Sequence, residues 1–430
     1  MIRQYNYPAP DSWAELVKRP VADYSLLEKP VRKILANVKE KGDKAVRKYS
    51  REFDGAKLKQ SAVTEKELKK AAGLVPDELK TAILQAKTNI EQFHKAQRED
   101  IKKTETEPGV VCWRQSAPIE KVGLYIPGGS APLFSTVLML AVPAQLAGCR
   151  EIILCTPPSK DESIHPAILY TAQLCGVTRI FKAGGVQAIG AMAYGTESIP
   201  SVFKIFGPGN QYVTMAKQLV QQAGVAIDMP AGPSEVLVIA DETATPSFVA
   251  ADLLSQAEHG ADSQVILLTT SAELAKKVTA EITKQLKQLQ RKNIAGKALE
   301  HSKIIVVENL SAAIALSNLY APEHLILACA GAENLAGQIT TAGSVFLGHF
   351  SPESAGDYAS GTNHTLPTNG YAAMYSGVSL DSFVKKITFQ QLSPDGLKRI
   401  ANTVMQMSAA EGLDAHKNAI AIRLNDHERI

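Results

Sequence analysis

The stretch from Ile227 to His259 reads IDMPAGPSEVLVIADETATPSFVAADLLSQAEH and predicts a strand followed by a helix. Its apolar run from 235 to 240 is typical of a buried strand. Thr245 fits the N-cap of the helix, Pro246 fits its first position, and Gly260 is predicted to end it in a left-handed conformation. The stretch therefore predicts one strand–helix unit with polar residues at both of its ends.

Short β-rich runs alternate with helical runs on both sides of this unit. Such alternation is typical of parallel sheets that are covered on both faces. We therefore predict an α/β fold with two tandem Rossmann-like parallel-sheet units, an N-terminal helical region and a C-terminal helical tail. The expected strands lie near 122–126, 151–155, 178–182 and 203–206, then near 235–240, 264–269, 303–308 and 344–347, with helices at 246–259, 272–292 and 310–319 between the later ones.

The same patterns suggest four segments along the chain. Residues 1–107 form an N-terminal helical region, because 13–103 is charged and repeats apolar residues at helical spacing. The first Rossmann-like domain then covers 108–233. The second covers 234–370 and includes a loop rich in Gly, Ser, Thr, Asn and Pro, and 371–430 form the helical tail.

The composition is that of an ordinary globular protein. The chain has 430 residues, of which 45% are hydrophobic, and its 46 basic and 43 acidic residues leave a net charge of only +3. The interleaved charges give no sign of a nucleic-acid or membrane partner. Five scattered cysteines, together with the absence of a secretory or membrane-spanning pattern, favour a reduced, cytoplasmic setting.

Gln256 and His259 end the apolar stripe of the predicted helix 246–259. Val249, Leu253 and Gln256 share one face, and His259 follows at its edge. A cation would suit both side chains, since each offers a lone pair and the helix C-terminus is negative. On spacing alone, a hydrogen-bonded core histidine beside an incidental glutamine is the favoured interpretation, because no common zinc motif is present.

Two other pairs carry chemistry in the second half of the chain. Asp357 and His364 share the loop at 351–370, where a scaffold commonly holds binding residues, although both could instead cap turns. Glu323 and His324 are adjacent, so we expect their side chains to point in different directions and to serve two tasks rather than one relay. Burial would have to move their pKa values toward neutrality for acid–base work.

The remaining candidates are weaker when taken alone. Glu411 and His416 lie five apart on a predicted helix and could flank a site or lie on an exposed surface. The dinucleotide pattern Gly-x-Gly-x-x-Gly is missing after a strand, but the turn at 207–210 opens a helix and could meet a phosphate. Cys149 and Cys329 are interpreted as structural, because neither has the cationic setting that a thiolate nucleophile needs.

Several blocks, in order along the chain, resemble the histidinol dehydrogenase family. The resemblance begins at Val122 and continues to Ala419, so it covers most of the chain. Its blocks are Gly123–Gly129, Gly184–Ala188, Phe206–Asn210, the run from Ile227 to His259, Ala321–His324, Gly356–His364 and Glu411–His416.

This resemblance implies an NAD-dependent, four-electron oxidation of L-histidinol through L-histidinal to L-histidine, the last step of histidine biosynthesis. It implies that Tyr125, Gln187 and Asn210 bind NAD. One Zn²⁺ per subunit would be held by Gln256, His259 and Asp357, with His416 from the other subunit of a homodimer that shares its active sites.

The resemblance also implies the roles of the acid–base residues. His324 would serve the proton of the alcohol and Glu323 would activate water for the aldehyde step. The substrate would be contacted by Ser234, Gln256, His259, His324, Asp357, His364, Glu411 and His416.

Two other functions fit most of the same residues. A zinc- and NAD-dependent dehydrogenase of another small alcohol would share nearly every block, and only a substrate panel separates it. A non-enzymatic, NAD-binding regulatory protein is the second alternative, which a turnover assay would exclude.

Overall fold

The computed structural model describes residues 2–20, 25–128, 131–230 and 232–427. They divide into two units. The first contains Met1–Ala96 and Ile119–Phe383, and the second contains Gln97–Pro118 and Val384–Ile430. Gly129 and Ala231, which belong to two of the sequence blocks above, lie outside the described residues.

A five-stranded parallel sheet, sheet B, forms one half of the first unit, with the strand order β6-β5-β4-β7-β8. In chain order this is third, second, first, fourth and fifth, so the connections reverse direction between β4 and β7. A crevice opens at such a switch point in open α/β sheets. The strands are β4 (Lys121–Tyr125), β5 (Glu151–Thr156), β6 (Arg179–Lys182), β7 (Lys204–Phe206) and β8 (Ala226–Ile227).

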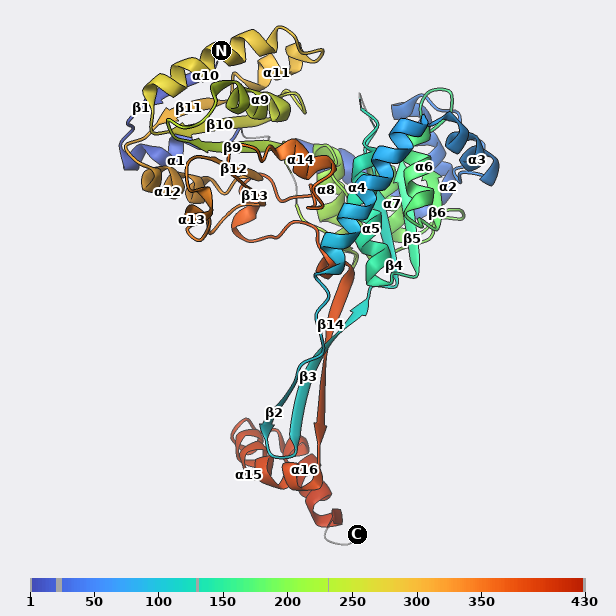
Figure 1. The fold of residues 1–430 in the computed structure, drawn as a ribbon. Helices are drawn as coiled ribbons and strands as arrows, with labels where there is room; N and C mark the ends of the chain where they lie inside the picture. The colour runs from blue at the N-terminus through green and yellow to red at the C-terminus, as the bar shows by residue number, and fades with distance from the viewer. Residues whose placement is uncertain (1, 21–24, 129–130, 231, 428–430) are drawn as a thin grey trace. The chain divides into compact units, whose positions relative to one another are not determined.

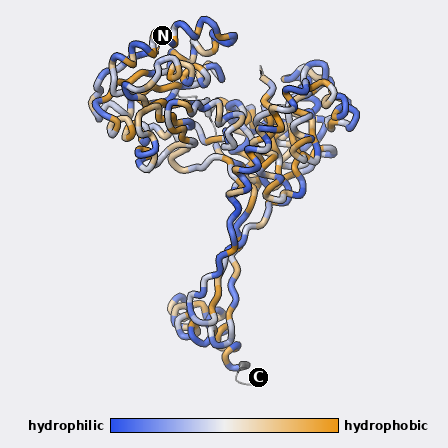
Figure 2. The backbone as a smooth tube through the Cα atoms, viewed as in Figure 1, coloured by the Kyte–Doolittle hydropathy of each residue, from blue (hydrophilic) through white to orange (hydrophobic). Residues whose placement is uncertain are grey.

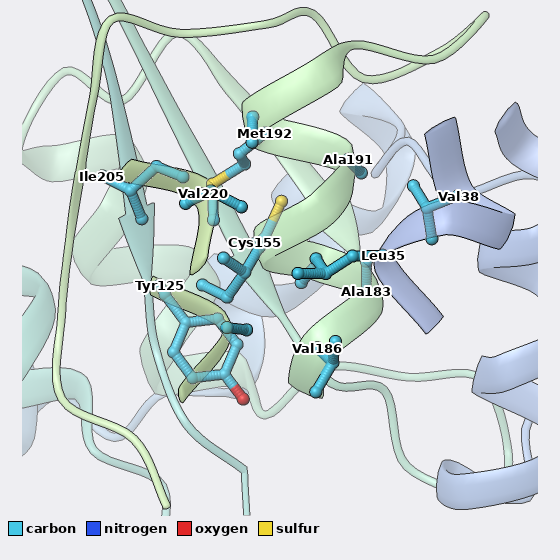
Figure 3. Packing of buried hydrophobic residues seen from close by; sticks show 14 of the residues in the cluster. Leu35, Val38, Tyr125, Cys155, Ala183, Val186, Ala191, Met192, Ile205 and Val220 are labelled. Carbon is cyan, nitrogen blue, oxygen red and sulfur yellow. The ribbon is translucent and has the colours of Figure 1, made fainter. Parts of the chain in front are cut away.

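Helices cover both faces of sheet B (Figure 1). One face packs against α2 (Ser25–Tyr49), α7 (Gly185–Tyr194) and α8 (Gln211–Gln221). Figure 3 shows Tyr125 within this core, with its hydroxyl oxygen directed away from Met192 and Ile205. The other face packs against α3 (Glu65–Leu74), α4 (Asp77–Lys95), α5 (Phe134–Ala147) and α6 (Pro166–Leu174).

Sheet A, the other half of the first unit, is six-stranded and parallel, with the order β1-β11-β10-β9-β12-β13. Apart from β1 at the edge, it repeats the strand order of sheet B. Its central strand β9 is buried at every residue, as its sequence EVLVIA predicts. The strands are β1 (Arg3–Asn6), β9 (Glu235–Ala240), β10 (Gln264–Thr269), β11 (Lys303–Val306), β12 (His324–Ala328) and β13 (Ser344–Leu347).

The helices around sheet A also form two layers (Figure 1). Many residues of these helices and strands are apolar, coloured orange along the backbone in Figure 2, and they form two buried clusters, one on each face of sheet A. One layer contains α9 (Pro246–Ala257), α10 (Ala272–Leu286) and α11 (Lys292–Ala298), and the other contains α1 (Trp13–Leu16), α12 (Leu310–Tyr320) and α13 (Ala332–Ala336). The shorter elements of this unit are η1 (Pro10–Ser12), η2 (Ser50–Asp54), α14 (Glu353–Tyr358), η3 (Tyr371–Ala373) and η4 (Leu380–Phe383).

The second unit is an antiparallel sheet with two helices. Its strand order is β14-β3-β2, with β2 at Lys103–Glu107, β3 at Val110–Pro118 and β14 at Val384–Leu392. Across β3 and β14 the rings of Trp113 and Phe389 stack with centroids 5.4 Å apart. Helices α15 (Pro394–Ala410) and α16 (Asp414–His427) follow.

The predicted fold class is confirmed: the chain has two parallel α/β sheets with helical N- and C-terminal regions. The four-segment division stays a prediction. The sequence interpretation missed β1, β8, β12 and the strands of the second unit. Exposed strands such as KTETE in β2 lack an alternating apolar pattern, and a short buried apolar run such as HLILA in β12 cannot be assigned by periodicity alone. Across the described residues, no helix combines the length and the apolarity needed to span a membrane.

One local prediction at the deciding helix was wrong. Helix α9 begins at Pro246 as expected, but it ends at Ala257, with Glu258 as its C-cap in a right-handed conformation. Gly260 is not among the glycines with positive φ, so it forms no left-handed cap. His259 therefore lies beyond the helix, in the turn before β10.

Candidate active site

The acid–base pair lies where two neighbouring strands of sheet A begin. His324 is the first residue of β12 and pairs in register with Val236 of β9. Ser234 directly precedes β9, and Glu323 directly precedes β12. Because parallel strands begin at the same edge, these residues gather at the amino edge of sheet A.

The Gln256 amide joins the two acid–base residues. Its Nε2 lies 3.3 Å from Oε2 of Glu323 and 3.1 Å from Nδ1 of His324. The Glu323 carboxylate lies 3.6 Å from the same imidazole nitrogen. The expectation that Glu323 and His324 point in different directions was therefore wrong, because Glu323 lies in the turn before the strand and escapes the strand's alternation.

The backbone of Glu235 holds all three of these side chains. Its N–H donates to Glu323 at 2.8 Å, and its carbonyl oxygen accepts from Gln256 at 3.3 Å and lies 3.1 Å from Nδ1 of His324. Its own carboxylate receives two bonds from Arg19, at 2.5 and 2.8 Å. A bidentate pair of this kind fixes geometry as well as charge. The sequence interpretation missed both Arg19 and Glu235.

Asp357 and His364 complete the imidazole's surroundings from the segment after β13. Asp357 lies on the short helix α14, and its Oδ1 is 3.5 Å from Nε2 of His324. His364 follows in the loop, with its Nδ1 2.8 Å from the backbone oxygen of Asp357 and its Nε2 3.1 Å from the Thr136 hydroxyl. The predicted loop thus contains one helical turn that aims Asp357 at His324.

These residues line one cavity of 370 Å³ in the first unit. The cavity brings together seven of the residues predicted to act in catalysis or to bind the metal or the substrate, and the predicted NAD residue Asn210 also lines it, with further residues after β7 and at the start of α5. The seven are Ser234, Gln256, His259, Glu323, His324, Asp357 and His364.

Besides Oγ of Ser263, three buried atoms of residues that line this cavity have no hydrogen-bond partner among the described residues. They are Oε1 of Gln256, Oδ1 of Asp357 and Nε2 of His324. Buried polar atoms without a partner are rare in native proteins and commonly mark a place for an ion, water or ligand. Two of the three are oxygen lone-pair donors from residues predicted to bind a metal.

Burial and neighbouring charges shift the acid–base groups of the cavity. Burial raises the pKa of Glu323 above its ordinary value, although His324 opposes this. For His324, burial opposes the charged form, but the carboxylates of Glu323 and Asp357 outweigh it and raise the imidazole pKa well above the ordinary value. Burial lowers the pKa of His259, which favours the neutral imidazole that a metal requires.

Glu353 is a third buried carboxyl group near His324, and the sequence interpretation missed it. It begins α14, is 1% exposed and accepts a hydrogen bond from the Ser255 hydroxyl at 2.8 Å. Burial raises its pKa to about 8. Its position in the same Gly-rich segment as Asp357 was the only signal in the sequence.

A second cavity, of 1020 Å³, lies at the carboxyl edge of sheet B. Tyr125, Gln187 and Asn210, the three residues predicted to bind NAD, all line it. Tyr125 ends β4, Gln187 lies in the first turn of α7, and Asn210 caps α8 by accepting from the backbone of Tyr212 and Val213. The cavity therefore occupies the crevice expected at the switch point of sheet B.

The backbone of the turn after β7 lies close to the backbone of Tyr125 in β4. Gly207 has φ +125°, and a side chain there would collide with the carbonyl oxygen of Tyr125. The N–H of Gly207 donates to Asp228 at 2.7 Å and its carbonyl accepts from Lys217 at 2.9 Å, while Lys217 and Asp228 form a buried ion pair. Only glycine fits this position, so the turn holds Asn210 between the two cavities.

Glu411 and His416 belong to the second unit and are exposed there. They do not share one helix, as the sequence spacing suggested: Glu411 caps the end of α15, Gly412 follows with φ +71°, and α16 begins at Asp414. The helix prediction failed because it overlooked Gly412 as a C-terminal signal.

The cysteines behave as the sequence suggested. All five are free, and burial raises the pKa of Cys149 to about 12 and that of Cys329 to about 11. Neither thiol is activated as a nucleophile.

Two parallel sheets with the same strand order, each with a polar cavity at one edge, define the class of the protein: a two-sheet, Rossmann-like α/β protein with an acid–base site. The model of the histidinol dehydrogenase family matches residues 17–424. The chain belongs to the histidinol dehydrogenase family.

Individual relatives carry the same name. The chain is 61% identical to the histidinol dehydrogenase of Bacteroides thetaiotaomicron, over 99% of both chains. It is 54% identical to that of Salmonella typhimurium, over 98% of this chain and 97% of the relative. The crystal structure of histidinol dehydrogenase from Elizabethkingia anophelis superposes with a TM-score of 0.98 at 58% identity, over 99% of both chains.

Proposed function

We propose that this chain oxidises L-histidinol through L-histidinal to L-histidine, with two molecules of NAD, as a homodimer in the cytoplasm. The observation that carries the proposal is the junction of the two cavities. Pro127 and Asn210 line both the acid–base cavity and the larger cavity of sheet B. A hydride donor in the first cavity would thus adjoin an acceptor in the second.

The larger cavity suits NAD in size and in chemistry. Both amide atoms of Gln187 are buried without a hydrogen-bond partner among the described residues, so this side chain is available to a ligand that has donors and acceptors. The Tyr125 hydroxyl accepts from the backbone of Gly185 at 3.0 Å and keeps its own proton to donate. When bound, NAD accepts one hydride in each of the two steps.

The acid–base cavity suits a divalent cation held from one side. Gln256 and Asp357 offer the unpartnered oxygens, and His259 offers a neutral imidazole in the same cavity. Across the described residues, no group of three or more His, Cys, Asp or Glu side chains is arranged as a metal site. This is consistent with a set of one His, one Asp and one Gln amide, to which we propose that His416 of the second subunit adds a ligand.

Zinc, when bound, would orient the substrate, which is the template role of a catalytic metal. Ser234, His364 and Glu411 would contact the substrate together with these ligands. With Asp357 engaged by a cation, one of the two carboxylates that hold the proton on His324 is withdrawn. The pKa of the His324 imidazole would then fall toward neutrality, where an imidazole works best as a base.

In the alcohol step, His324 takes the hydroxyl proton while the carbon that bears the hydroxyl gives a hydride to NAD. The product of this step is the aldehyde. In the aldehyde step, Glu323 removes a proton from water while the water oxygen adds to the carbonyl carbon, and His324 returns the proton that it took in the alcohol step to the carbonyl oxygen, which gives a diol. His324 then takes a hydroxyl proton from the resulting diol as the second hydride leaves. The raised pKa of Glu323 makes its carboxylate a stronger base than an exposed one.

A turnover assay tests the proposal. With L-histidinol, two NADH should form for each L-histidine, and removal of the metal with a chelator should abolish turnover but leave the circular dichroism spectrum unchanged. Oxidation of another small alcohol alone would favour the related-dehydrogenase alternative. No turnover by the metal-loaded protein would favour a regulatory role.

The metal site has its own control within the chain. His259→Asn should lower the zinc content and the activity together, because it removes a ligand. His301→Asn changes an exposed histidine that does not line the cavity. It should change neither the zinc content nor the activity. Full activity of a metal-free preparation would contradict the assignment.

A further inference from the structure

An acidic side chain outside the predicted site lines the larger cavity. Asp54 is the last residue of a π-helical turn, η2, and Gly55 ends that turn with φ +72°. Single π-helical turns are rare and occur frequently at functional sites. The turn comes from the N-terminal helical region, far in sequence from the cofactor residues, and it places a carboxylate beside them.

One oxygen of the Asp54 carboxylate, the buried Oδ2, lacks a hydrogen-bond partner within the described part of the chain. Burial raises the pKa of Asp54 to about 6. A second sign of proximity is that the Asp54 charge, in addition to burial, contributes to the raised pKa of Tyr125. A buried acceptor without a partner has lost its bonds to water, so a ligand that donates hydrogen bonds to it binds more tightly.

Asp54 lies away from the junction of the two cavities. It lines only the larger cavity, together with Phe53 and Lys160, whereas the junction is at Pro127 and Asn210. Hydride transfer requires the nicotinamide at the junction, so the other end of the dinucleotide, the adenosine, extends toward Asp54. Phe53 is 56% exposed there and offers an aromatic face to a base.

Lys160 lines the same cavity as Asp54. A Cβ on Gly55 would lie 3.4 Å from Cγ of Lys160, which places the Lys160 stem beside the turn. Within the described part of the chain, Lys160 forms no hydrogen bond to Oδ2 of Asp54. A phosphate at this end would therefore meet one anion and one cation, and a ribose diol would meet an acceptor that needs donors.

We propose that Asp54 makes this chain select NAD over NADP, by accepting hydrogen bonds from the adenosine ribose hydroxyls and repelling a 2′-phosphate. The inference rests on the proposed function, because it requires a dinucleotide in the larger cavity. Acidic residues serve this purpose at the second strand of other dinucleotide-binding folds, whereas here the carboxylate comes from the turn after α2.

Calorimetric titration of the whole protein, without histidinol, tests the inference independently of catalysis. The wild-type protein is titrated with NAD, with NADP and with the NAD analogue that lacks the 2′-hydroxyl of the adenosine ribose. The analogue should bind about 10- to 100-fold more weakly than NAD, the loss expected for one hydrogen bond to a charged group.

Asp54→Asn provides the second arm. The preference for NAD over NADP should fall at least about tenfold, because a neutral amide no longer repels phosphate and Lys160 still attracts it. The difference in affinity between NAD and its 2′-deoxy analogue should narrow, because the amide oxygen accepts a weaker hydrogen bond than a carboxylate does. Glu52→Gln, an exposed carboxylate of the same turn that does not line the cavity, should change neither ratio. Thermal unfolding should show no loss of stability in Asp54→Asn, since no contact in the free protein is removed.

The outcomes separate the two proposals. Wild-type protein that binds NAD and the 2′-deoxy analogue equally, with an unchanged NAD preference in Asp54→Asn, would overturn the role of Asp54 alone. Wild-type protein that binds neither NAD nor NADP would overturn the proposed function and this inference with it.

Discussion

Sheets A and B have the same strand order, but their cavities lie at opposite edges. In sheet B the cavity residues follow the carboxyl ends of β4 and β7, where open α/β sheets generally bind ligands. In sheet A the cavity residues Ser234 and His324 lie at the amino ends of β9 and β12. Strand order therefore predicts where a crevice opens, but it does not decide which edge carries the chemistry.

The chain path explains why the amino edge of sheet A is suitable. Helix α9 runs back across the sheet, so its C-terminal end returns to the edge where β10 begins. Gln256 and His259 lie at that end, beside the first residues of β9 and β12. The negative end of the helix then faces a site that is proposed to hold a cation, which is a favourable arrangement.

Charge also separates the two edges. The amino edge of sheet A gathers the carboxyl groups of Glu323, Glu353 and Asp357 around one imidazole. At sheet B, Tyr125, Gln187 and Asn210 are uncharged, and the one carboxylate proposed to bind NAD, that of Asp54, comes from the turn after α2. Proton chemistry is thus assigned to one sheet and cofactor binding to the other, and substitutions on one edge should leave the other function intact.

The largest effect is expected for Glu323→Gln. The substitution keeps the size of the side chain and an oxygen that can accept from the Glu235 N–H, but it removes the base that activates water. Histidinal oxidation should fall about 10²- to 10⁴-fold, far more than the first hydride transfer, while the NAD affinity stays unchanged.

Single-turnover measurements with histidinol and with histidinal separate the two steps. Glu333→Gln, an exposed carboxylate on α13, is the matched control and should slow neither step. Equal slowing of both oxidations by Glu323→Gln would contradict the division of roles between Glu323 and His324.

Glu353 is expected to change the equilibrium constant of unfolding by about tenfold per pH unit. Its ordinary pKa is 4.5 and burial raises it to about 8 in the folded protein. Between these pH values the folded state holds a proton that the unfolded state has released, so the free energy of unfolding falls as pH rises, by at most about 1.4 kcal/mol per unit. Glu353→Gln should flatten this decline.

Urea unfolding of the metal-free protein at pH 5, 6.5 and 8 measures this dependence. Glu308→Gln, which changes an exposed carboxylate after β11, should keep the wild-type slope. If the wild-type and Glu353→Gln curves ran parallel, Glu353 would not be the buried proton carrier at the amino edge.

How far the sequence predicts this architecture depends on burial. Strands such as β9, buried on both faces, are continuous apolar runs and were predicted within a residue or two. The exposed strands of the second unit carry no such pattern, and the apolar run of β12 is only four residues long. Their strand structure depends on pairing with segments remote in sequence, such as β14 with β3, which local periodicity does not encode.

The candidate site shows the same limit at the level of single residues. Resemblance supplied the residues that are proposed to contact ligands, and the structure gathers ten of them in two cavities. It did not supply Arg19, Glu235 or Glu353, because their roles depend on contacts across more than 90 residues, such as Arg19 with Glu235 and Ser255 with Glu353. Spacing alone also misjudged how Glu323 approaches His324.

A loss of about tenfold in NAD affinity is expected for Gln187→Ala at sheet B. The buried amide would lose about one net hydrogen bond to the cofactor, and the zinc content should remain at the wild-type value because the metal residues lie at sheet A. Gln173→Ala, an exposed glutamine on α6, is the matched control. A fall in zinc content together with NAD affinity would show that the two edges are not independent.

The smallest effect, a fourfold deficit relative to wild type, tests whether the amino edge of sheet A is completed by a second subunit. If each C-terminal segment completes its partner's site, a His416→Ala chain mixed with a His259→Ala chain rebuilds one site in each mixed dimer. Random reassortment makes about half of the dimers mixed, each with one intact site of two, so activity should recover to roughly a quarter of the wild-type value.

Mixing His416→Ala with Glu411→Ala should give no recovery, because both changes lie in the C-terminal segment and each site then receives a damaged segment. If verified subunit exchange of the first pair also restores no activity, His416 serves its own chain or no site.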